Sequence, residues 1–358
     1  MTEATRREAN ELYTFFSLLA SGSIGRANAL GKTDSEIPVF AVRRHEHDGQ
    51  RLYAIEEKEV HIQGTAMDVR FPREDFAAAA EWLLSQLKRQ GSETIDITEL
   101  EGFLDALAIY DMEAQTDDRT DLHLTLWHPD APPIGMRLHS RLCSNPPLFV
   151  GGRGANIKYE QSGVRFSQPA VSKINHTDQP ENVAEVARRI LYIQSQGGIL
   201  RYCDVADKVF RSNLLMLDTN LPRIIAAMLM TLHLDGTSRL SELVKMLDEK
   251  NPLKMKEELL QKHGFYQYKV RQLLLATAWG LRPQVIWNGR ASAVGGYLMT
   301  DENGTLAAFL RADEQTFSDY LLAHARLVKT LPDEDKYGYL ERENGNYYLK
   351  LNLKINMT

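Results

Sequence analysis

The sequence predicts an α+β protein, because segments with two different periodicities occupy different parts of the chain. Runs in which apolar and polar residues alternate dominate residues 37–63 and 121–166, and they return after residue 296. Between residues 181 and 279 the apolar residues instead recur every three or four positions, as in amphipathic helices. We therefore expect a mixed sheet core, a helical insertion and a C-terminal β-hairpin element.

The first third of the chain is expected to combine helices and strands. Leu12, Phe15 and Leu19 form an apolar stripe that indicates the first helix. His47-Asp48-Gly49 is a turn signal between two alternating segments. The expected elements are a helix over 7–20, strands over 37–43, 51–56 and 60–63, and helices over 72–89 and 98–108.

The remaining elements follow from the same two patterns. Asn303-Gly304 and Asn344-Gly345 are hairpin signals near the C-terminus. Strands are expected over 156–160, 164–166, 296–300, 305–311, 337–342 and 347–355, and helices over 181–196, 205–217, 221–234, 240–247, 253–261 and 268–279. These elements suggest a mixed-sheet core over 1–176, a helical region over 177–280 and an α+β region over 281–358.

Composition excludes several classes of protein. No apolar run is long enough to cross a bilayer, and the residues from Met1 to Glu8 do not resemble a secretory signal. Cys143 and Cys203 provide no framework of disulfides or zinc ligands, so we expect free thiols. The sequence therefore predicts a cytoplasmic protein with no membrane partner.

The net charge of −6 at pH 7 hides an uneven distribution. Residues 92–130 contain eleven acids and a single base, Arg119. Residues 134–176 contain six bases and a single acid, Glu160. This local excess of positive charge predicts a surface that receives an anion, and an ordinary solvated surface is the alternative.

The segment Asp121–Leu142 predicts a β-hairpin whose alternation sorts its side chains onto two faces. Leu122 points to one face of the first strand, and Asp121 points to the other. Arg137 and His139 share one face of the returning strand. An acid that faces cationic groups across a hairpin is typical of metal-dependent nucleases, which hold a scissile phosphate in this way.

Several segments resemble, in the same order, the HpaII-type type II restriction endonucleases. They are the opening helix Asn10–Ala20, the hairpin Asp121–Leu142, Pro146–Phe149 with Ala155–Glu160, the helical block Ile199–Leu214 with Leu221–Ala226, Trp287–Gly289 with Gly295–Tyr297, and the closing Gly345–Ile355. Their common order argues against chance similarity.

The resemblance implies a PD-(D/E)XK nuclease core and Mg²⁺-dependent, sequence-specific hydrolysis of double-stranded DNA. It also implies a short G·C-rich palindromic target such as CCGG, and a companion DNA methyltransferase in the cell. Asp121 matches the family's metal-binding Asp, and Glu11 matches an acid on the opening helix that reaches the same site. Both are therefore expected metal ligands. A palindrome can be cut by a homodimer or by monomers, so the oligomeric state stays open.

The chain departs from the family pattern at the catalytic cation. Where the family reads Ser-x-Lys, this chain reads Arg137-Leu138-His139, so His139 replaces the Lys. An imidazole with a pKa of about 6.5 can accept a proton at neutral pH, whereas the guanidinium of Arg137 can only clamp an anion or stabilise the transition state. A guanidinium about 5 Å from a divalent cation repels it by roughly 6–7 kcal/mol at an effective dielectric of about 20. Metal binding should therefore depend on a DNA phosphate as an extra ligand.

Three hypotheses follow from this substitution. The favoured one is a metal-dependent endonuclease in which Asp121, Glu11, Arg137 and His139 are catalytic. The second is a sequence-specific DNA-binding protein that has lost cleavage. The third is a metal-independent reaction that uses His139 and Arg137.

Further residues are predicted to contact DNA. Arg153 follows glycines that permit a close approach of the backbone to a phosphate, and a plain surface loop is the alternative. The predicted DNA contacts are Arg141, Arg153, Asn156, Lys158, Arg201, Lys208 and Arg211, the last three of which also suit a solvated helix face. Asp117 and Asp118 are expected to be solvated turn acids, either of which can replace a missing metal ligand.

Overall fold

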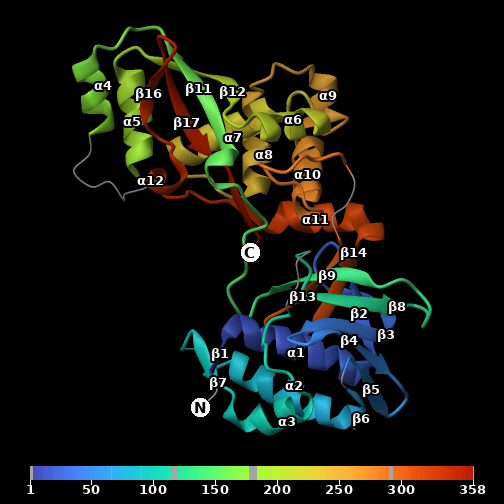
Figure 1. Cartoon of the computed structure of the whole chain (residues 1–358). Coiled ribbons are helices and arrows are strands. Elements are labelled where there is room, and N and C mark those ends of the chain that lie inside the picture. Colours follow the sequence, from blue (N-terminus) through green and yellow to red (C-terminus); the bar gives the residue numbers. More distant parts are fainter. Residues whose placement is uncertain are drawn as a thin grey trace. The chain divides into compact units, whose positions relative to one another are not determined.

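The computed structural model describes residues 3–65, 67–89, 91–114, 119–176, 184–289 and 293–357. The chain forms two compact units, each built from two segments. The first unit contains Met1–Asn145 and Ala291–Tyr320, and the second contains Pro146–Arg290 and Leu321–Thr358. Both units mix helices and sheets, as the predicted α+β class requires (Figure 1). These units are discontinuous, whereas the three regions predicted from the sequence are consecutive segments.

A sheet of nine strands organises the first unit. In spatial order it contains β2 (Ser23–Ala27), β14 (Leu306–Leu310), β13 (Val294–Thr300), β9 (Ile134–Ser140), β8 (Leu122–Leu126), β3 (Thr33–Glu46), β4 (Gly49–Ile55), β5 (Glu59–Gln63) and β6 (Asp68–Pro72). β13 pairs with β9 in parallel, and β14 pairs with β2 in parallel. Strands from near the C-terminus therefore lie inside a sheet that is otherwise N-terminal, as the orange β13 and β14 show among blue and green strands (Figure 1).

The long strand β3 makes this sheet curl back on itself. Its first part, from Thr33 to Pro38, pairs with β2, and its later part pairs with β8 and β4. The predicted turn at His47-Asp48-Gly49 is confirmed, because Glu46 pairs with Gly49 across a two-residue connection. β2 thus has a partner on each side, β14 and β3.

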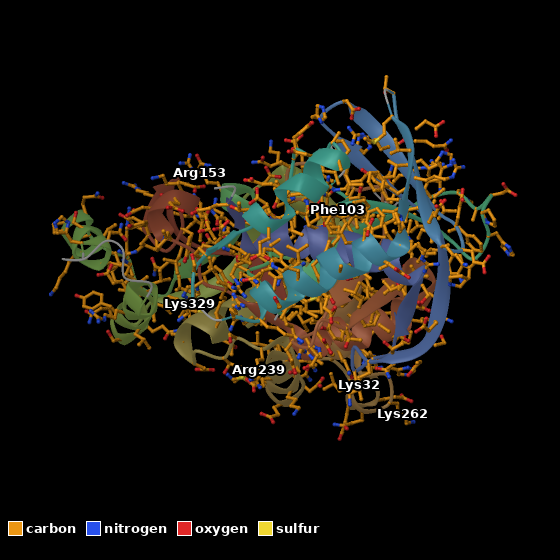
Figure 2. All side chains as sticks on the ribbon, turned by 90° about the horizontal axis from the view of Figure 1, so that it is seen from below. Lys32, Phe103, Arg153, Arg239, Lys262 and Lys329 are labelled. Carbon is orange, nitrogen blue, oxygen red and sulfur yellow. The ribbon has the colours of Figure 1, made fainter. Side chains whose placement is uncertain are left out.

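Helices α1 (Arg6–Ser21), α2 (Arg73–Leu87) and α3 (Glu101–Ala106) complete the core of this unit, beside the small sheet of β1 (Glu3–Thr5) and β7 (Thr94–Asp96). A capping box at Thr5 and Glu8 fixes the start of α1, and Gly22 ends it in the left-handed conformation at φ 64°. The apolar stripe of α1 is buried with Leu122 and Met136 of the β8–β9 hairpin. Phe103, labelled in Figure 2, packs against Phe16 in the same core.

The second unit contains two antiparallel sheets. One has the order β12 (Ile199–Val205), β11 (Asn156–Ser162), β17 (Asn346–Asn352) and β16 (Leu340–Glu343), and the other has the order β10 (Phe149–Val150), β18 (Lys354–Met357) and β15 (Ala325–Leu327). The predicted hairpin at Asn344-Gly345 is confirmed, and both residues have the positive φ that this tight turn requires. Figure 1 shows this red hairpin beside the green β11.

Helices of the second unit cover the sheets and form a bundle of their own. They are α4 (Gln168–Asn175), α5 (Ala184–Ser195), α6 (Lys208–Leu217), α7 (Leu221–Leu234), α8 (Leu240–Lys250), α9 (Glu257–Gln261), α10 (Phe265–Ala278) and α12 (Pro332–Asp335), while α11 (Glu314–His324) spans the division between the units. No single helix of the described residues is long and apolar enough to cross a membrane. Only α6 and α7 together pass that test, as a pair bent by 108°.

Several elements differ from the sequence-based prediction. The strand predicted over 164–166 is absent from the described structure, because Gly163 turns the chain at φ 90° and Phe166 packs into a small core instead. The predicted helix over 205–217 starts only at Lys208, since β12 ends at Val205. The helices α4 and α11 were missed, because their apolar residues are too few to show a clear period. Residues 115–118, including Asp117 and Asp118, lie outside the described residues.

The imidazole of His233, on α7, is an unusual feature of the second unit. Its Nδ1 is buried and has no hydrogen-bond partner within the described part of the chain. Burial lowers the pKa of His233 from 6.5 to about 3, and the positive charge of Lys329 adds to the decrease. The folded protein therefore holds this imidazole in its neutral form.

This depressed pKa predicts a loss of stability in mild acid. Above pH 6.5 the imidazole is neutral in both the folded and the unfolded state, and between pH 6.5 and about 3 only the unfolded state binds the proton. The free energy of unfolding should fall by up to about 1.4 kcal/mol per pH unit in this window. We expect His233→Leu to flatten the pH dependence measured by denaturant unfolding. The exposed His263→Gln should leave it unchanged, and an unaltered slope in His233→Leu would contradict the assignment.

Candidate active site

Asp121 stands immediately before β8 and is fixed against the backbone of β9. Its N–H donates to the carbonyl of Met136 at 2.8 Å, and its Oδ2 accepts a hydrogen bond from the N–H of Leu138 at 2.6 Å. The Asp121 side chain is nevertheless 21% exposed, so the carboxylate remains accessible. Burial raises its pKa, whereas the Leu138 N–H and the guanidinium groups of Arg137 and Arg7 lower it.

Arg137 and His139 follow one another on the same side of β9. The hairpin register makes residue 137 the cross-strand neighbour of Asp121. The guanidinium carbon of Arg137 also lies 5.9 Å from the ring centroid of Tyr297. His139 is roughly 7 Å further along the strand, where it is 5% exposed and pairs with Met299 of β13. The structure thus brings Arg137 to Asp121 and encloses His139 within the sheet of the first unit.

Glu11 approaches this cluster from α1. Its Oε1 accepts a hydrogen bond from the N–H of Ala114 at 2.6 Å, and Nη2 of Arg44 lies 3.4 Å from the same oxygen. Burial raises the pKa of Glu11 to about 8; Arg44 opposes this rise, and the negative charge of Asp121 adds to it. The two carboxylates predicted to bind the metal are therefore close enough for the charge of Asp121 to act on Glu11.

Arg44 holds the Glu11 side of the cluster in place. Its guanidinium is completely buried, and its Nη1 donates to Oε2 of Glu46 at 2.5 Å. Its Nη2 also donates to the carbonyls of Asp111 at 2.9 Å and Met112 at 2.6 Å. These bonds connect β3, α1 and the segment that leads to Ala114. Sequence reasoning missed Arg44, because the alternation of β3 gives no sign that an arginine lies on the buried face.

Glu113 and Arg7 are two further members of the cluster that sequence reasoning missed. Nε of Arg7 lies 3.1 Å from Oε1 of Glu113, and Nη2 of Arg7 lies 3.9 Å from Oδ1 of Asp121. The charge of Glu113 contributes to the raised pKa of both Glu11 and Asp121. Glu113 belongs to the acidic run over 92–130, but no periodic pattern separates it from its neighbours. Arg7 differs from Glu11 by one helical turn, and that spacing was the available signal.

Residues 5–357 of this chain match the HpaII restriction endonuclease family. The chain belongs to that family. It is 27% identical over 365 residues to the Type II restriction enzyme HpaII of Haemophilus parainfluenzae, with 99% of each chain covered. No solved structure matches the chain. Membership in the HpaII restriction endonuclease family confirms the predicted class of enzyme, a type II site-specific deoxyribonuclease that acts on double-stranded DNA.

The residues predicted to contact DNA are divided between the two units of this family member. Arg141, in the first unit, pairs with Glu302 at 3.2 Å and lines a cavity of about 380 Å³ with Lys32 and Tyr320. The other predicted contacts lie in the second unit. Arg141 is therefore neutralised by Glu302, rather than by the acidic cluster around Asp121.

Asn156 has a structural position in the second unit. Its side chain is 2% exposed, and its Nδ2 donates to the carbonyls of Asp335 at 2.8 Å and Lys336 at 3.2 Å. Its Oδ1 accepts a hydrogen bond from Asn352 at 2.8 Å. The amide is thus fully used inside the protein. The side chain has no free edge that could reach DNA in the folded chain.

The glycines near Arg153 serve packing. A Cβ on Gly151 would overlap the ring of Pro283, and a Cβ on Gly154 would press on Pro283 and Gln284. The space left by these glycines is therefore filled by the segment that contains Pro283 and Gln284, and not by a phosphate. Arg153 itself is exposed (Figure 2), and its Nε donates to the carbonyl of Glu334 at 3.3 Å.

Four other predicted DNA contacts are accessible to different degrees. Lys158 forms an ion pair with Glu343, and its Nζ lies 3.9 Å from the ring centroid of Tyr348. Arg211 pairs with Asp204 at 3.1 Å. Arg201, on the edge strand β12, and Lys208, at the start of α6, are exposed. Of this group, Arg201 and Lys208 are the most available for contact with a polyanion.

The bonding of Asn156 predicts that its removal damages stability rather than DNA recognition. Asn156→Ala removes two hydrogen bonds to partly buried carbonyls and leaves the amide of Asn352 with Gly152 alone, which should lower the free energy of unfolding by about 1–3 kcal/mol. Affinity for duplex DNA should be unchanged at a temperature where the variant is folded. Thermal unfolding and DNA titration measure the two effects. A stable variant with weakened DNA binding would contradict the structural assignment.

Proposed function

We propose that this restriction endonuclease hydrolyses DNA at the Asp121 cluster, with a nuclease core of PD-(D/E)XK type and Mg²⁺ as cofactor. The observation that carries the proposal is the coupling of two carboxylates from distant segments. Asp121 comes from the hairpin and Glu11 from α1, and the negative charge of Asp121 contributes to the raised pKa of Glu11. The mixed sheet with α1 against the hairpin supports this type of core.

The electrostatics of the carboxylates favour a cation at this position. Burial raises the pKa of Glu11 to about 8, and repulsion by the negative charge of Asp121 adds to this rise. A divalent cation bound between them would relieve that repulsion. When bound, Mg²⁺ supplies polarisation of the phosphate and a lower pKa for the attacking water.

The proposed ligand set is small. Within the described ranges, no group of three or more His, Cys, Asp or Glu side chains is arranged to hold a metal ion. Asp121 and Glu11 are therefore proposed to bind Mg²⁺ together with a phosphate oxygen of DNA. Arg7, which already bridges Glu113 and Asp121, is proposed to release the carboxylates as the cation and the phosphate enter.

The cationic side chains are proposed to act on the scissile phosphate and on the attacking water. Arg137, beside Asp121, suits electrostatic stabilisation of the phosphorane-like transition state, because its guanidinium remains protonated. His139 occupies the position of the family's Lys, and we propose that it accepts or orients the proton of the attacking water. The enclosed environment of His139 supports an ordered proton acceptor rather than a surface imidazole.

The wider biological setting follows from the family. We propose a short G·C-rich palindrome such as CCGG as the target, read by side chains at base edges in the major groove. A homodimer suits the twofold symmetry of such a target. We propose a cytoplasmic location for the enzyme. A companion DNA methyltransferase is proposed because the enzyme would otherwise cut the DNA of its own cell.

The first test removes the metal or its principal ligand. Plasmid cleavage should require Mg²⁺ and stop in EDTA, and Asp121→Ala should lower the cleavage rate more than about a thousandfold, since it removes several kcal/mol of transition-state stabilisation. DNA binding by Asp121→Ala should persist. Asp105→Ala, which removes an exposed acid of α3 in the same unit, is the matched control. Normal cutting by Asp121→Ala, or EDTA-resistant cutting by the wild type, would point to the metal-independent route.

The second test restores the residue type of the family. We expect His139→Lys to retain or increase the single-turnover cleavage rate, because an ammonium can orient water and offset phosphate charge. His139→Ala should lower the rate about a hundredfold, since it removes the proton acceptor. Both variants should bind duplex DNA like the wild type. Equal rates for His139→Ala and the wild type would remove His139 from the reaction.

A further inference from the structure

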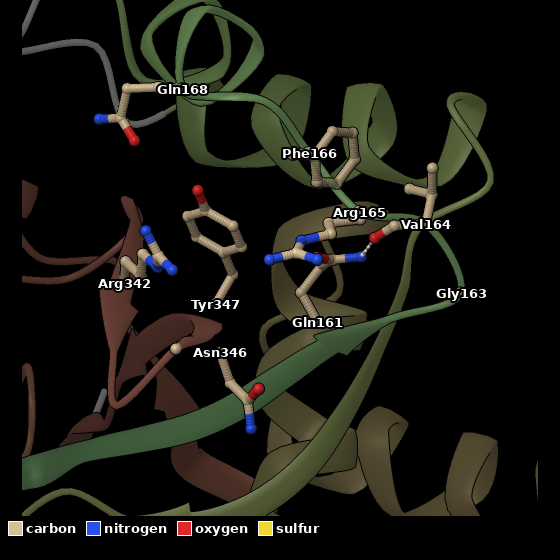
Figure 3. Close-up of a pocket in the computed structure, with 10 residues that line it drawn as sticks. Gln161, Gly163, Val164, Arg165, Phe166, Gln168, Arg342, Asn346 and Tyr347 are labelled. Atoms are coloured by element: carbon tan, nitrogen blue, oxygen red, sulfur yellow. Dashed lines mark hydrogen bonds between the residues drawn. The ribbon is translucent and has the colours of Figure 1, made fainter.

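A cavity of about 560 Å³ opens in the second unit, between the loop after β11 and the β16–β17 hairpin (Figure 3). Its walls carry the basic side chains of Arg165 and Arg342, the ring of Tyr347 and the amides of Gln161 and Gln168. This volume is in the range of small-ligand sites. None of these residues is used by the proposed active site.

Strand pairing aligns the cavity wall. Tyr347 of β17 pairs with Arg342 of β16 on one side and with Gln161 of β11 on the other. Cross-strand partners share a face of the sheet, so these three side chains form a row. In Figure 3 the ring of Tyr347 lies between the guanidinium groups of Arg342 and Arg165. The cavity therefore combines an aromatic surface with a cation on either side.

Gln161 fixes the loop that carries Arg165. Gln161 is 8% exposed. Its Nε2 donates to the carbonyls of Ser162 at 2.7 Å and Val164 at 2.8 Å, and the second bond is drawn in Figure 3. Gly163 allows the turn at φ 90°. The loop is thus held by the sheet, and Arg165 projects from a defined position.

The charge of the two arginines is not neutralised. Within the described residues neither the Arg165 nor the Arg342 side chain has a hydrogen bond or an ion pair, and both are exposed. The acids of the hairpin, Glu341 and Glu343, alternate to the opposite face, where Lys350 contacts both of them. The first residue of α4, Gln168, also lines the cavity, and the positive end of that helix adds to the same potential.

We propose that this cavity is a DNA-backbone site, in which Arg165 and Arg342 hold one phosphate and Tyr347 packs against the adjoining nucleoside. The inference rests on the proposed action on duplex DNA. Paired guanidinium groups match the geometry of phosphate oxygens, and an aromatic ring accepts any nucleoside without regard to sequence. Arg165, Arg342, Gly345 and Asn346 are all exposed, so the cavity admits a polymer and does not enclose a free ligand.

The test measures DNA affinity with the full chain in EDTA, in an Asp121→Ala background that prevents cutting. Two short duplexes are used, one with CCGG and one with the same bases scrambled. Arg165→Ala and Arg342→Ala should each weaken binding to both duplexes about tenfold, because each removes a charge-assisted contact to the backbone. The double variant should also lower the slope of log affinity against log salt by about one.

Matched variants separate a local site from general charge. Arg239→Ala combined with Lys262→Ala removes the same charge from exposed side chains of the second unit that do not line the cavity (Figure 2). This control should keep the wild-type salt slope. Tyr347→Phe should retain affinity and Tyr347→Ala should lose it, because the ring supplies the contact surface. Thermal unfolding checks that all variants are folded.

Four outcomes would overturn the inference. A double variant that behaves like its charge-matched control would show that the cavity is no DNA site. A loss confined to the CCGG duplex would assign the arginines to base reading instead. Binding of a free deoxynucleoside monophosphate as tightly as of duplex would identify a nucleotide site. A wild-type chain that bound neither duplex would overturn the proposed function together with this inference.

Discussion

The fully buried guanidinium of Arg44 is the constraint on which the candidate active site depends. A buried charge is held by close partners, and removal of one partner typically costs about 3–5 kcal/mol. Glu46, Glu11 and two backbone carbonyls are the partners of its Nη1 and Nη2, while its Nε has no hydrogen-bond partner among the described residues. Through these bonds Arg44 holds α1 and the segment before Ala114 against β3. The same bonds keep Glu11, whose pKa is raised to about 8, near Asp121. Apolar side chains in place of Arg44 would not hold the Glu11 carboxyl group there.

The fold could be predicted where a periodic pattern or a turn motif marked it. The hairpin β8–β9 and the turn at Asn344-Gly345 appear where local chemistry placed them. Pairing between distant segments could not be predicted in this way. No local feature of Val294–Thr300 indicates that it lies parallel to β9, because parallel neighbours are joined through long connections. The discontinuous units have the same origin.

The candidate site was predictable in part for similar reasons. Alternation placed Asp121 and Arg137 across one hairpin, and a family resemblance added Glu11. Arg7 and Glu113 were recognised only in the tertiary structure, although Arg7 lies one helical turn before Glu11, because Glu113 belongs to an irregular segment and Arg7 to a helix end. Asn156 shows the opposite error, since this polar residue after a glycine-rich loop is itself buried and donates to backbone carbonyls of the same unit. Sequence patterns identify which residues have suitable chemistry, whereas burial decides which of them meet substrate.

The insertion of β13 and β14 between β9 and β2 also affects how the enzyme can be made. A ribosome releases the N-terminus first, yet the strand that carries Arg137 lacks its neighbour until residues 294–310 have been synthesised. Until then β9 and β2 have unpaired edges, which are sites for mispairing between chains. The sheet that carries the candidate active site is therefore completed late in translation. A fragment that ends before residue 294 would accordingly lack the parallel partner of β9.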